Sequence, residues 1–404
     1  MALYTPMLPP PPPLRLAVRA SLAPSSTIRE LLAVTELPGM RSLAGGLPDP
    51  ATFPVDALRD AAQRVLVAGS DRAYRALQYG PTDGLADFRA AIARSTVLHG
   101  LHAMNPDELV VTTGSQQALD LLTRTLIDPG DDVAVEDPCY LGARQTFLAG
   151  GAVLRGIPVD AQGMQTDVLA ELLAAGYRPR FVYTVANFQN PTGATLNADR
   201  RRALVALAEQ YGFVIVEDDP YRSLSFTGQP FQSLGALNSD VVVSLGSLSK
   251  VLSPGMRLGW LRAPTWIREA IVRAKQACDL HTSTLTQLIA LQILEMPGFI
   301  DAHIAANRIR YANRADALCA ALVARGFEVA MPSGGMFTWV HMPGIDTEAL
   351  LAQVIAEGVA FVPGAAFAVD QQWQHYARLS FATLGEPDLV IAANILADVA
   401  NSFK

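Results

Sequence analysis

The sequence predicts an α/β protein in which helices cover both faces of a mostly parallel sheet, followed by a smaller α+β domain. Between positions 107 and about 263, short apolar runs alternate with amphipathic stretches, which is typical of a parallel sheet with crossover helices. The chain has 404 residues, a length that suggests two or three domains. Half of the residues are hydrophobic and only 17% are charged, so the composition indicates a large core and excludes a disordered chain.

The elements before the alternating region are short. Pro9–Pro13 is a run of five prolines, which predicts a stiff arm. Ser25–Leu32 has hydroxyl residues before its first apolar positions and Glu30 in its first turn, so it predicts a capped helix. Ala44–Pro50 is rich in turn residues and predicts a loop, whereas Asp56–Ala68 has helical periodicity.

The alternating region and the segments after it predict most of the fold. Short apolar runs predict strands at Leu109–Thr112, Asp132–Glu136, Phe181–Thr184, Phe213–Glu217, Val241–Leu245 and Leu258–Leu261. Amphipathic stretches between them predict helices at Gln116–Leu126 and Ala198–Tyr211. A long helical stretch over Thr265–Val323 follows, with a break at Pro297-Gly298. The smaller domain is predicted from strand-like runs at Met336–His341, Ala360–Val362 and Ala377–Phe381 and from helical ones at Thr347–Glu357 and Glu386–Phe403.

Composition and motifs argue against several classes of protein. The net charge of −7 argues against a nucleic-acid binder, which would carry a basic surface. The three cysteines lack CxxC spacing and the six histidines form no HExxH motif, so we predict no metal site. The longest uncharged stretches are interrupted by turn or polar residues, so we expect no membrane span. The proline run would interrupt a signal peptide, and we therefore expect a cytoplasmic protein.

Residues able to bind an anion follow the first predicted strand. Ligands of parallel sheets bind beyond the carboxyl ends of the strands, so these positions are where function is expected. Gly114, Ser115 and Gln116 open a helix whose free N–H groups could hold an anion. On its own, this pattern is more often only a helix cap.

Two carboxylates and a tyrosine follow the fourth predicted strand. Pro220 stops that strand and leaves Asp218 and Asp219 at its end, with Tyr221 directly after. For this segment alone, a solvated turn is the ordinary interpretation.

A lysine follows the fifth predicted strand. Lys250 comes after Ser247 and Ser249 and precedes Arg257 by seven positions. A lysine held where burial or a nearby cation lowers its pKa can attack a carbonyl and form a Schiff base. The hydroxyls and Arg257 could hold a phosphate, whereas the alternative is an ordinary exposed lysine.

These three groups together meet the demands of one ligand. A phosphate needs a helix N-terminus, hydroxyls and an arginine, a pyridinium nitrogen needs a carboxylate, and an aldehyde needs a lysine. Pyridoxal 5′-phosphate makes all three demands, so we predict it as the cofactor.

The chain resembles the fold-type I pyridoxal-phosphate aminotransferases of the aspartate aminotransferase superfamily, class I/II, from Thr27 to Phe381. The motifs that carry the resemblance are Tyr79-Gly80, Gly114-Ser115-Gln116, Asn190-Pro191-Thr192-Gly193, Asp218-x-x-Tyr221, Ser247-x-Ser249-Lys250 and Arg378-Leu379-Ser380. Arg29 and the segment Ser42–Pro48 are most similar to the 2-aminoadipate and kynurenine aminotransferase group.

The resemblance implies a fold and a domain organisation. It implies a three-layer αβα large domain with a mostly parallel, seven-stranded sheet, plus the smaller α+β domain. Residues 1–50 would form an N-terminal arm and a substrate-covering helix that pack with the small domain. The large cofactor-binding domain would span residues 51–295 and the small domain residues 296–404.

The resemblance also implies the roles of the cofactor-binding residues. Lys250 would form the Schiff base and carry the proton, Asp218 would pair with the pyridinium nitrogen in preference to Asp219, and Tyr221 would bond the cofactor's 3′-oxygen. Tyr140 would stack on the ring. The remaining implied cofactor contacts are Gly114, Ser115, Gln116, Asn190, Ser247, Ser249 and Arg257.

The implied partners are small molecules and a second copy of the chain. Arg378 would hold the substrate α-carboxylate as a bidentate fork, with Asn190, Gly46 and Arg29 also contacting substrate. Tyr79 would reach the phosphate in the partner's site, which implies a homodimer.

The predicted reaction moves the α-amino group of an amino acid to a 2-oxo acid such as 2-oxoglutarate. Arg29 could pair with the distal carboxylate of 2-aminoadipate or glutamate, and a helix-surface arginine is an equal alternative. A broad specificity for apolar or branched, aromatic and dicarboxylic amino acids is therefore expected. Two other functions stay open. One is elimination, cyclisation or oxidation with the same cofactor, and the other is a regulator without turnover, against which the 26 residues before Thr27 argue.

Overall fold

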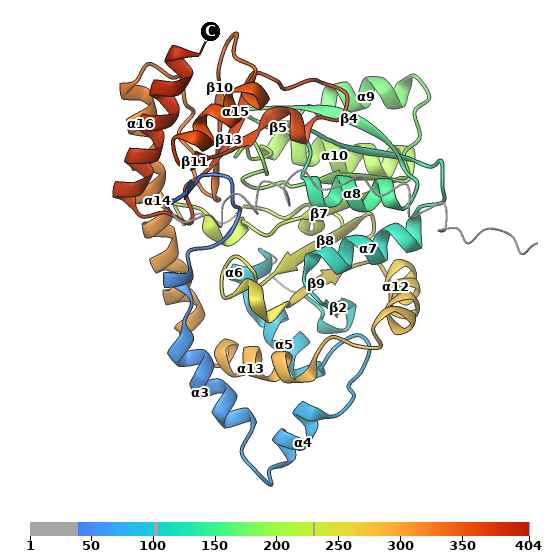
Figure 1. Ribbon diagram of the computed structural model, residues 1–404. Coiled ribbons are helices and arrows are strands. Elements are labelled where there is room, and N and C mark those ends of the chain that lie inside the picture. Colours follow the sequence, from blue (N-terminus) through green and yellow to red (C-terminus); the bar gives the residue numbers. More distant parts are fainter. Residues whose placement is uncertain (1–38, 101–103, 229–230, 404) are drawn as a thin grey trace, which may run out of the picture.

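The computed structural model describes residues 39–100, 104–228 and 231–403. These residues form the predicted α/β fold around one large sheet with strand order β2-β9-β8-β7-β6-β3-β4-β5 (Figure 1). Its strands are β2 (Leu109–Thr112), β3 (Asp132–Asp137), β4 (Val153–Asp160), β5 (Gly163–Met164), β6 (Phe181–Thr184), β7 (Val214–Asp218), β8 (Val242–Ser247) and β9 (Gly259–Arg262). The sheet has eight strands where the resemblance implied seven, because the two-residue β5 pairs with the end of β4 as a short hairpin.

Strand direction in this sheet is mostly parallel, as predicted. The neighbours β4, β3, β6, β7 and β8 all run parallel to one another. The strand β9 runs antiparallel to both β2 and β8, and β5 runs antiparallel to β4. The carboxyl ends of β3, β6, β7 and β8 therefore lie at one edge, where the segments carrying Tyr140, Asn190, Asp218 and Lys250 begin.

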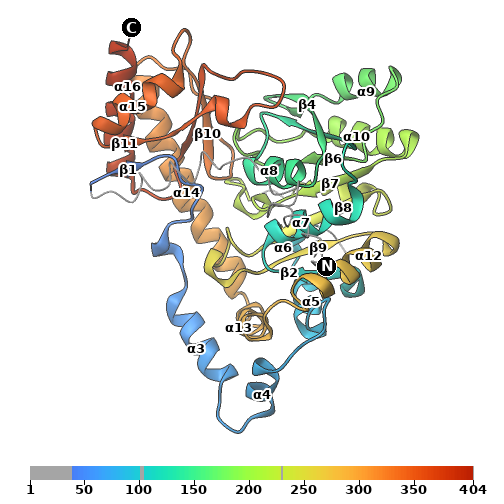
Figure 2. The same ribbon diagram turned by 45° about the vertical axis from the view of Figure 1, so that its right-hand side comes forward.

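Helices cover both faces of the sheet and form two separate cores with it. One core contains buried residues of α7 (Ser115–Leu126), α8 (Leu141–Ala149) and α12 (Thr265–Cys278). The other contains residues of α9 (Thr166–Ala174) and α10 (Ala198–Tyr211) with α11 (Leu234–Leu237). Neighbouring strand residues alternate between the two cores, since side chains of a strand point to opposite faces. The result is the expected three-layer arrangement (Figure 2).

Four helices lie beyond the β2–β9 end of the sheet, where α3 and α4 extend away from its body (Figure 1). They are α3 (Val55–Val65), α4 (Asp71–Leu77), α5 (Ala86–Arg94) and α13 (Thr284–Leu294). The short α6 (Thr96–His99) follows α5 and is joined to the segment after β7 by a hydrogen bond from Oγ of Ser223 to the Val97 oxygen. The long stretch predicted from Thr265 breaks at Pro297-Gly298 as expected, and α14 (Phe299–Ala324) follows. It also breaks between Cys278 and Thr284, which the prediction missed. There Ser283 caps α13 by accepting from the Thr286 N–H.

The C-terminal part forms a three-stranded sheet with its own helices. It consists of β10 (Phe337–His341), β13 (Tyr376–Ser380) and β12 (Val362–Pro363), with α15 (Thr347–Ala356) and α16 (Glu386–Ser402). Near the start of the described chain, β1 (Arg41–Ser42) pairs in parallel with β11 (Val359–Ala360), so the first described residues join this part. The exact domain boundaries stay a prediction.

Short 3-10 turns complete the described chain: η1 (Pro50–Thr52), η2 (Pro106–Glu108), η3 (Arg222–Leu224), η4 (Pro254–Met256) and η5 (Gly364–Phe367). Within the described ranges, no single helix is long and apolar enough to cross a membrane, although the bent pair α13 and α14 passes that test by length and composition.

Candidate active site

A cavity of about 330 Å³ lies at the carboxyl ends of the parallel strands. Segments far apart in the sequence line it, from residues 44–47 near the N-terminus to β13 near the C-terminus. The predicted site residues that line it are Gly46, Ser115, Gln116, Tyr140, Asn190, Asp218, Tyr221, Ser247, Ser249, Lys250, Arg257 and Arg378.

Lys250 lies in the turn that follows β8, with its amine in this cavity. Its Nζ donates to the backbone oxygen of Gly46 at 2.8 Å. Burial, followed by the positive charges of Arg378 and Arg257, lowers the pKa of Lys250 to about 8, against the opposing effect of Asp218. The amine is therefore partly uncharged near neutral pH, which is the form that attacks a carbonyl.

Asp218 is the carboxylate that faces the cavity. Its Oδ2 accepts a hydrogen bond from Oη of Tyr183 at 2.9 Å. Its Oδ1 is buried and has no hydrogen-bond partner among the described residues. Burial raises the pKa of Asp218 to about 7 although the Tyr183 hydrogen bond acts to lower it. A cationic N–H donor at Oδ1 would satisfy this buried oxygen and favour its charged form.

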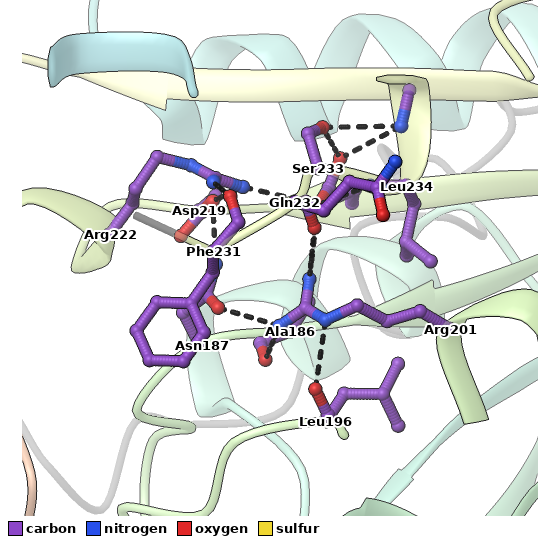
Figure 3. Close-up of polar contacts among 12 residues, drawn as sticks. Ala186, Asn187, Leu196, Arg201, Asp219, Arg222, Phe231, Gln232, Ser233 and Leu234 are labelled. Carbon is purple, nitrogen blue, oxygen red and sulfur yellow. Dashed lines mark hydrogen bonds and ion pairs between the residues drawn. The ribbon is translucent and has the colours of Figure 1, made fainter. Parts of the chain in front are cut away.

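The carboxylates on either side, Glu217 and Asp219, belong to a separate buried network. Figure 3 shows its part around Asp219, Arg222 and Arg201. Asp219 pairs with Arg222 and accepts from Nδ2 of Asn187 at 2.8 Å. Asn187 in turn accepts from Nη2 of Arg201 at 2.6 Å. Successive side chains of a strand alternate between faces, so Glu217 and Asp219 point away from the side of Asp218. Arg201 and Arg222 pair with Glu217, Arg222 also pairs with Asp219, and Asp218 lines the cavity.

One end of the cavity is suited to an anion. Helix α7 begins at Ser115, so its first free N–H groups and the positive end of its dipole lie here. Ser247 donates through Oγ to Oγ of Ser249 at 2.9 Å, and both side chains line the cavity. Gly114 is not in the lining, but a Cβ there would lie 2.5 Å from Nη2 of Arg257. The glycine therefore makes room for the Arg257 guanidinium.

Arg378 lines the cavity as well and comes from β13. Its guanidinium carbon lies 4.4 Å from the ring centroid of Phe337 and 5.0 Å from that of Phe367. Burial lowers the pKa of Arg378 to about 10, so the guanidinium stays charged at neutral pH. A buried guanidinium held in this way can bind a carboxylate through two parallel hydrogen bonds.

Tyr221, Tyr140 and Gln116 are neutral polar residues of the lining. Tyr221 is buried and meets Phe337 edge to face, with 5.9 Å between ring centroids. Tyr140 precedes α8, and burial raises its pKa to about 12. Nε2 of Gln116 donates to Oγ1 of Thr146 at 2.6 Å, which fixes this side chain against α8.

Two predicted residues of the described chain, Gly114 and Tyr79, are not in the lining. Tyr79 lies on the surface with 78% of its area exposed, and its ring meets that of His281 edge to face at 5.8 Å. Arg29 lies outside the described residues.

Seven lining residues were not predicted as site residues: Ala44, Gly45, Leu47, Val185, Pro220, Pro254 and Phe337. Leu47 and Phe337 line the cavity, and a Cβ on Gly46 would lie 2.9 Å from Cζ of Phe337. The strand-like pattern of residues 336–341 predicted a strand at Phe337, but nothing in that pattern showed that its side chain would reach this site.

The residues present fit pyridoxal 5′-phosphate. The amine of Lys250 suits its aldehyde, the partnerless Oδ1 of Asp218 suits its pyridinium N–H, and the N-terminus of α7 with Arg257 suits its phosphate. Arg378 remains available for a substrate carboxylate.

Comparison with known proteins assigns the family. Residues 43–396 match the family "Aminotransferase class I and II". The chain is 41% identical to aromatic-amino-acid aminotransferase 1 of Thermococcus litoralis, over 90% of this chain and 88% of that protein. It is 40% identical to 2-aminoadipate transaminase of Thermus thermophilus, over 89% of this chain and 90% of that protein.

Solved structures agree with this assignment. The α-aminoadipate aminotransferase of Thermus thermophilus, solved with N-(5′-phosphopyridoxyl)-L-leucine, matches with a TM-score of 0.88 and 37% identity. The match covers 96% of this chain and 97% of that one. As the motifs predicted, the chain belongs to the class I and II aminotransferases, which are pyridoxal-phosphate enzymes of fold type I.

Proposed function

We propose that this aminotransferase has a broad donor range, moving the α-amino group of apolar, aromatic or dicarboxylic amino acids to a 2-oxo acid such as 2-oxoglutarate. One observation carries the proposal. Lys250, whose pKa is lowered to about 8, shares a cavity of about 330 Å³ with the buried carboxyl of Asp218 and the fixed guanidinium of Arg378. That combination provides a proton carrier, a partner for a ring nitrogen and a carboxylate clamp.

We assign the cofactor to the residues that line one side of the cavity. Asp218 would hold the ring nitrogen, Tyr221 and Asn190 the 3′-oxygen, and Tyr140 the ring face. The phosphate would be held at the start of α7, beside Gly114, by Ser115, Gln116, Ser247, Ser249 and Arg257. When bound, pyridoxal phosphate supplies an electron-withdrawing ring that makes the α-hydrogen of the amino acid acidic.

The residues of this chain would then bind the substrate and move its proton. Arg378 would hold the α-carboxylate and so orient the Cα–H bond, while Gly46 and Asn190 line the same end. Lys250 would take the proton from Cα and return it at the neighbouring carbon, for which an amine with a pKa of about 8 is well matched.

The lining residues support acceptance of apolar and aromatic side chains. Among the described lining residues the cations are Lys250, Arg257 and Arg378, and each has a proposed role with cofactor or α-carboxylate. Leu47 and Phe337 offer apolar contacts in their place. Acceptance of 2-aminoadipate or glutamate would depend on Arg29, which lies outside the described residues. The names of relatives, which include aromatic and 2-aminoadipate aminotransferases, are compatible with both classes.

The active form is proposed to be a homodimer. Large hydrophobic residues are exposed together at the end of the molecule formed by α3 and α4, namely Leu66, Val67, Tyr74, Leu77 and Tyr79. A second copy covering this surface would bury them and would bring Tyr79 toward the partner's phosphate site. The cytoplasmic location stays a prediction that cell fractionation would test.

Mapping the lysine that captures the cofactor, together with a substrate panel, would test the proposal. The chain has three lysines, Lys250, Lys275 and Lys404, so peptide mapping after borohydride reduction gives an unambiguous site. Lys275 is buried and paired with Asp279, which makes Lys275→Met a matched control. We expect label on Lys250, loss of label in Lys250→Ala, and amino transfer from aromatic and apolar donors to 2-oxoglutarate. Label on Lys250 without transfer to any acceptor would refute the proposed reaction.

A further inference from the structure

We propose that Tyr183 is a positioning residue for the cofactor: its hydroxyl fixes Oδ2 of Asp218 and so leaves Oδ1 available to the ring nitrogen. The inference rests on the proposed pairing of Asp218 with that nitrogen. Tyr183 does not line the cavity and is fully buried in β6, the strand next to β7 that ends in Asp218. It would therefore act only through Asp218.

The contact itself is well defined. Oη of Tyr183 donates to Oδ2 of Asp218 at 2.9 Å, and both groups are buried. Oδ1 of the same carboxylate has no partner among the described residues. A carboxylate with one oxygen anchored and the other free can offer the free oxygen to a single donor without rotating.

The tyrosine ring is held so that its hydroxyl keeps this position. It meets Phe147 edge to face, with 5.4 Å between centroids, and belongs to the core that lies under α7 and α8. Adjacent strands β6 and β7 are hydrogen-bonded with Tyr183 opposite Val216, so the separation between the two side chains is set by the sheet register.

The pKa shifts of the two groups also favour a hydrogen bond donated by Tyr183 to Asp218. Burial and the nearby Asp218 charge raise the pKa of Tyr183 well above its usual value, so the phenol remains a donor. The hydrogen bond opposes the desolvation that raises the pKa of Asp218. Without that bond, the charged carboxylate needed to pair with a pyridinium would be less favoured.

A pair of ligands distinguishes a positioning role for Tyr183 from a merely structural one. The probes are pyridoxal 5′-phosphate and its 1-deaza analogue, in which a C–H replaces the ring nitrogen. Affinity of the cofactor-free protein for each is measured by equilibrium titration of absorbance. Tyr183→Phe keeps the ring packing and removes only the hydroxyl.

We expect Tyr183→Phe to weaken binding of pyridoxal 5′-phosphate by about tenfold, the lower end for a hydrogen bond to a charged group, and to leave binding of the deaza analogue within about twofold. Tyr183→Leu also lacks the donor, so it too must weaken binding of pyridoxal 5′-phosphate more than binding of the deaza analogue. Tyr177→Phe is the control, since its buried hydroxyl has no hydrogen-bond partner among the described residues, and it should change neither affinity.

Equal weakening of both ligands, or no weakening of either, would overturn the positioning role. Asp218→Asn separates that result from failure of the proposed function. This variant should lose most of the preference for pyridoxal 5′-phosphate over the analogue. If it keeps the preference, the assignment of Asp218 is wrong and the inference about Tyr183 falls with it.

Discussion

Arg378 donates through Nη1 to Oδ1 of Asn190 at 2.8 Å, which joins β13 of the C-terminal part to the loop after β6 of the large sheet. Its Nη2 donates to the backbone oxygen of Ala44 at 2.5 Å. The Arg378 guanidinium, the proposed carboxylate clamp, is therefore held by segments that are far apart in the sequence. Phe337 and Phe367 face the guanidinium and add cation–π attraction that favours its charged form.

Replacing this guanidinium by an amine should impair every amino donor. A lysine cannot form the two parallel hydrogen bonds of a fork, so Arg378→Lys should lower kcat/KM by roughly ten- to hundredfold. Initial rates with an aromatic and a dicarboxylic donor would measure this loss. Arg325→Lys, at a surface pair with Asp398, is the control and should leave both rates unchanged. A loss confined to the dicarboxylic donor would contradict a role in binding the α-carboxylate.

The capture of pyridoxal phosphate by the cofactor-free protein should depend on pH through Lys250. Only the uncharged amine attacks an aldehyde, and the pKa of Lys250 is lowered to about 8. The capture rate should therefore rise with pH and level off above about 8, well below the usual lysine value of 10.5. Stopped-flow absorbance measures this rate. Arg257→Gln removes a neighbouring cation and should move the midpoint upward.

The same lowered pKa has a consequence for stability. Between about 8 and 10.5 the unfolded chain holds a proton on this lysine that the folded chain has released. The contribution of Lys250 to the free energy of unfolding should therefore increase as pH rises through this window. Urea unfolding of the cofactor-free protein and of Lys250→Met at several pH values would measure the difference. A wild-type contribution that falls with rising pH would contradict the lowered pKa.

The buried ion pairs beside the site should be important for folding. Arg222 pairs with both Glu217 and Asp219, and all three side chains are buried. The pair with Asp219 is drawn in Figure 3. Arg222→Met leaves these carboxylates short of a cation and should lower the free energy of unfolding by about 3–5 kcal/mol. Arg202→Met breaks an exposed pair with Asp199 and should lower it by less than about 1 kcal/mol. Similar values for the two variants in urea unfolding would contradict the argument.

The sequence predicted the central strands well because burial on both faces produces continuous apolar runs. The bounds of β2 and β6 agree with the predicted ones, and every residue in both strands is buried. The strand β4 was missed, since it lies toward the sheet edge and its residues Val153–Asp160 include an arginine, a glycine and a proline with partly exposed positions. Helix α8 was missed because it follows the Tyr140 segment directly and has little amphipathic character.

The site was predictable where residues follow strand ends and unpredictable where distant segments meet. Lys250 and Asp218 follow neighbouring parallel strands, so topology alone brings them together. Phe337 and the Ala44 oxygen reach the cavity only through packing of the C-terminal part against the large sheet. Tyr183 lay in a run predicted only as a strand, and its contact with Asp218 depends on the pairing of β6 with β7.

Complementation between two inactive variants should test the shared active site. If Tyr79 serves the partner's phosphate site, a hybrid of Tyr79→Ala with Lys250→Ala has one site with both defects and one intact site. Random exchange of an equal mixture should then restore roughly a quarter of the wild-type sites, since half of the dimers are hybrids with one intact site each.

Activity of the mixture, measured after subunit exchange under mild denaturant, would show the recovery. Lys250→Ala mixed with Asp218→Asn is the control: both residues line the same cavity, so every hybrid site keeps one defect and no recovery is expected. Recovery in the control would mean that Lys250 and Asp218 do not serve one site. No recovery in the Tyr79→Ala mixture despite exchange would mean that Tyr79 serves its own subunit or neither. In that case the exposed apolar surface of α3 and α4 would need another explanation than a shared site.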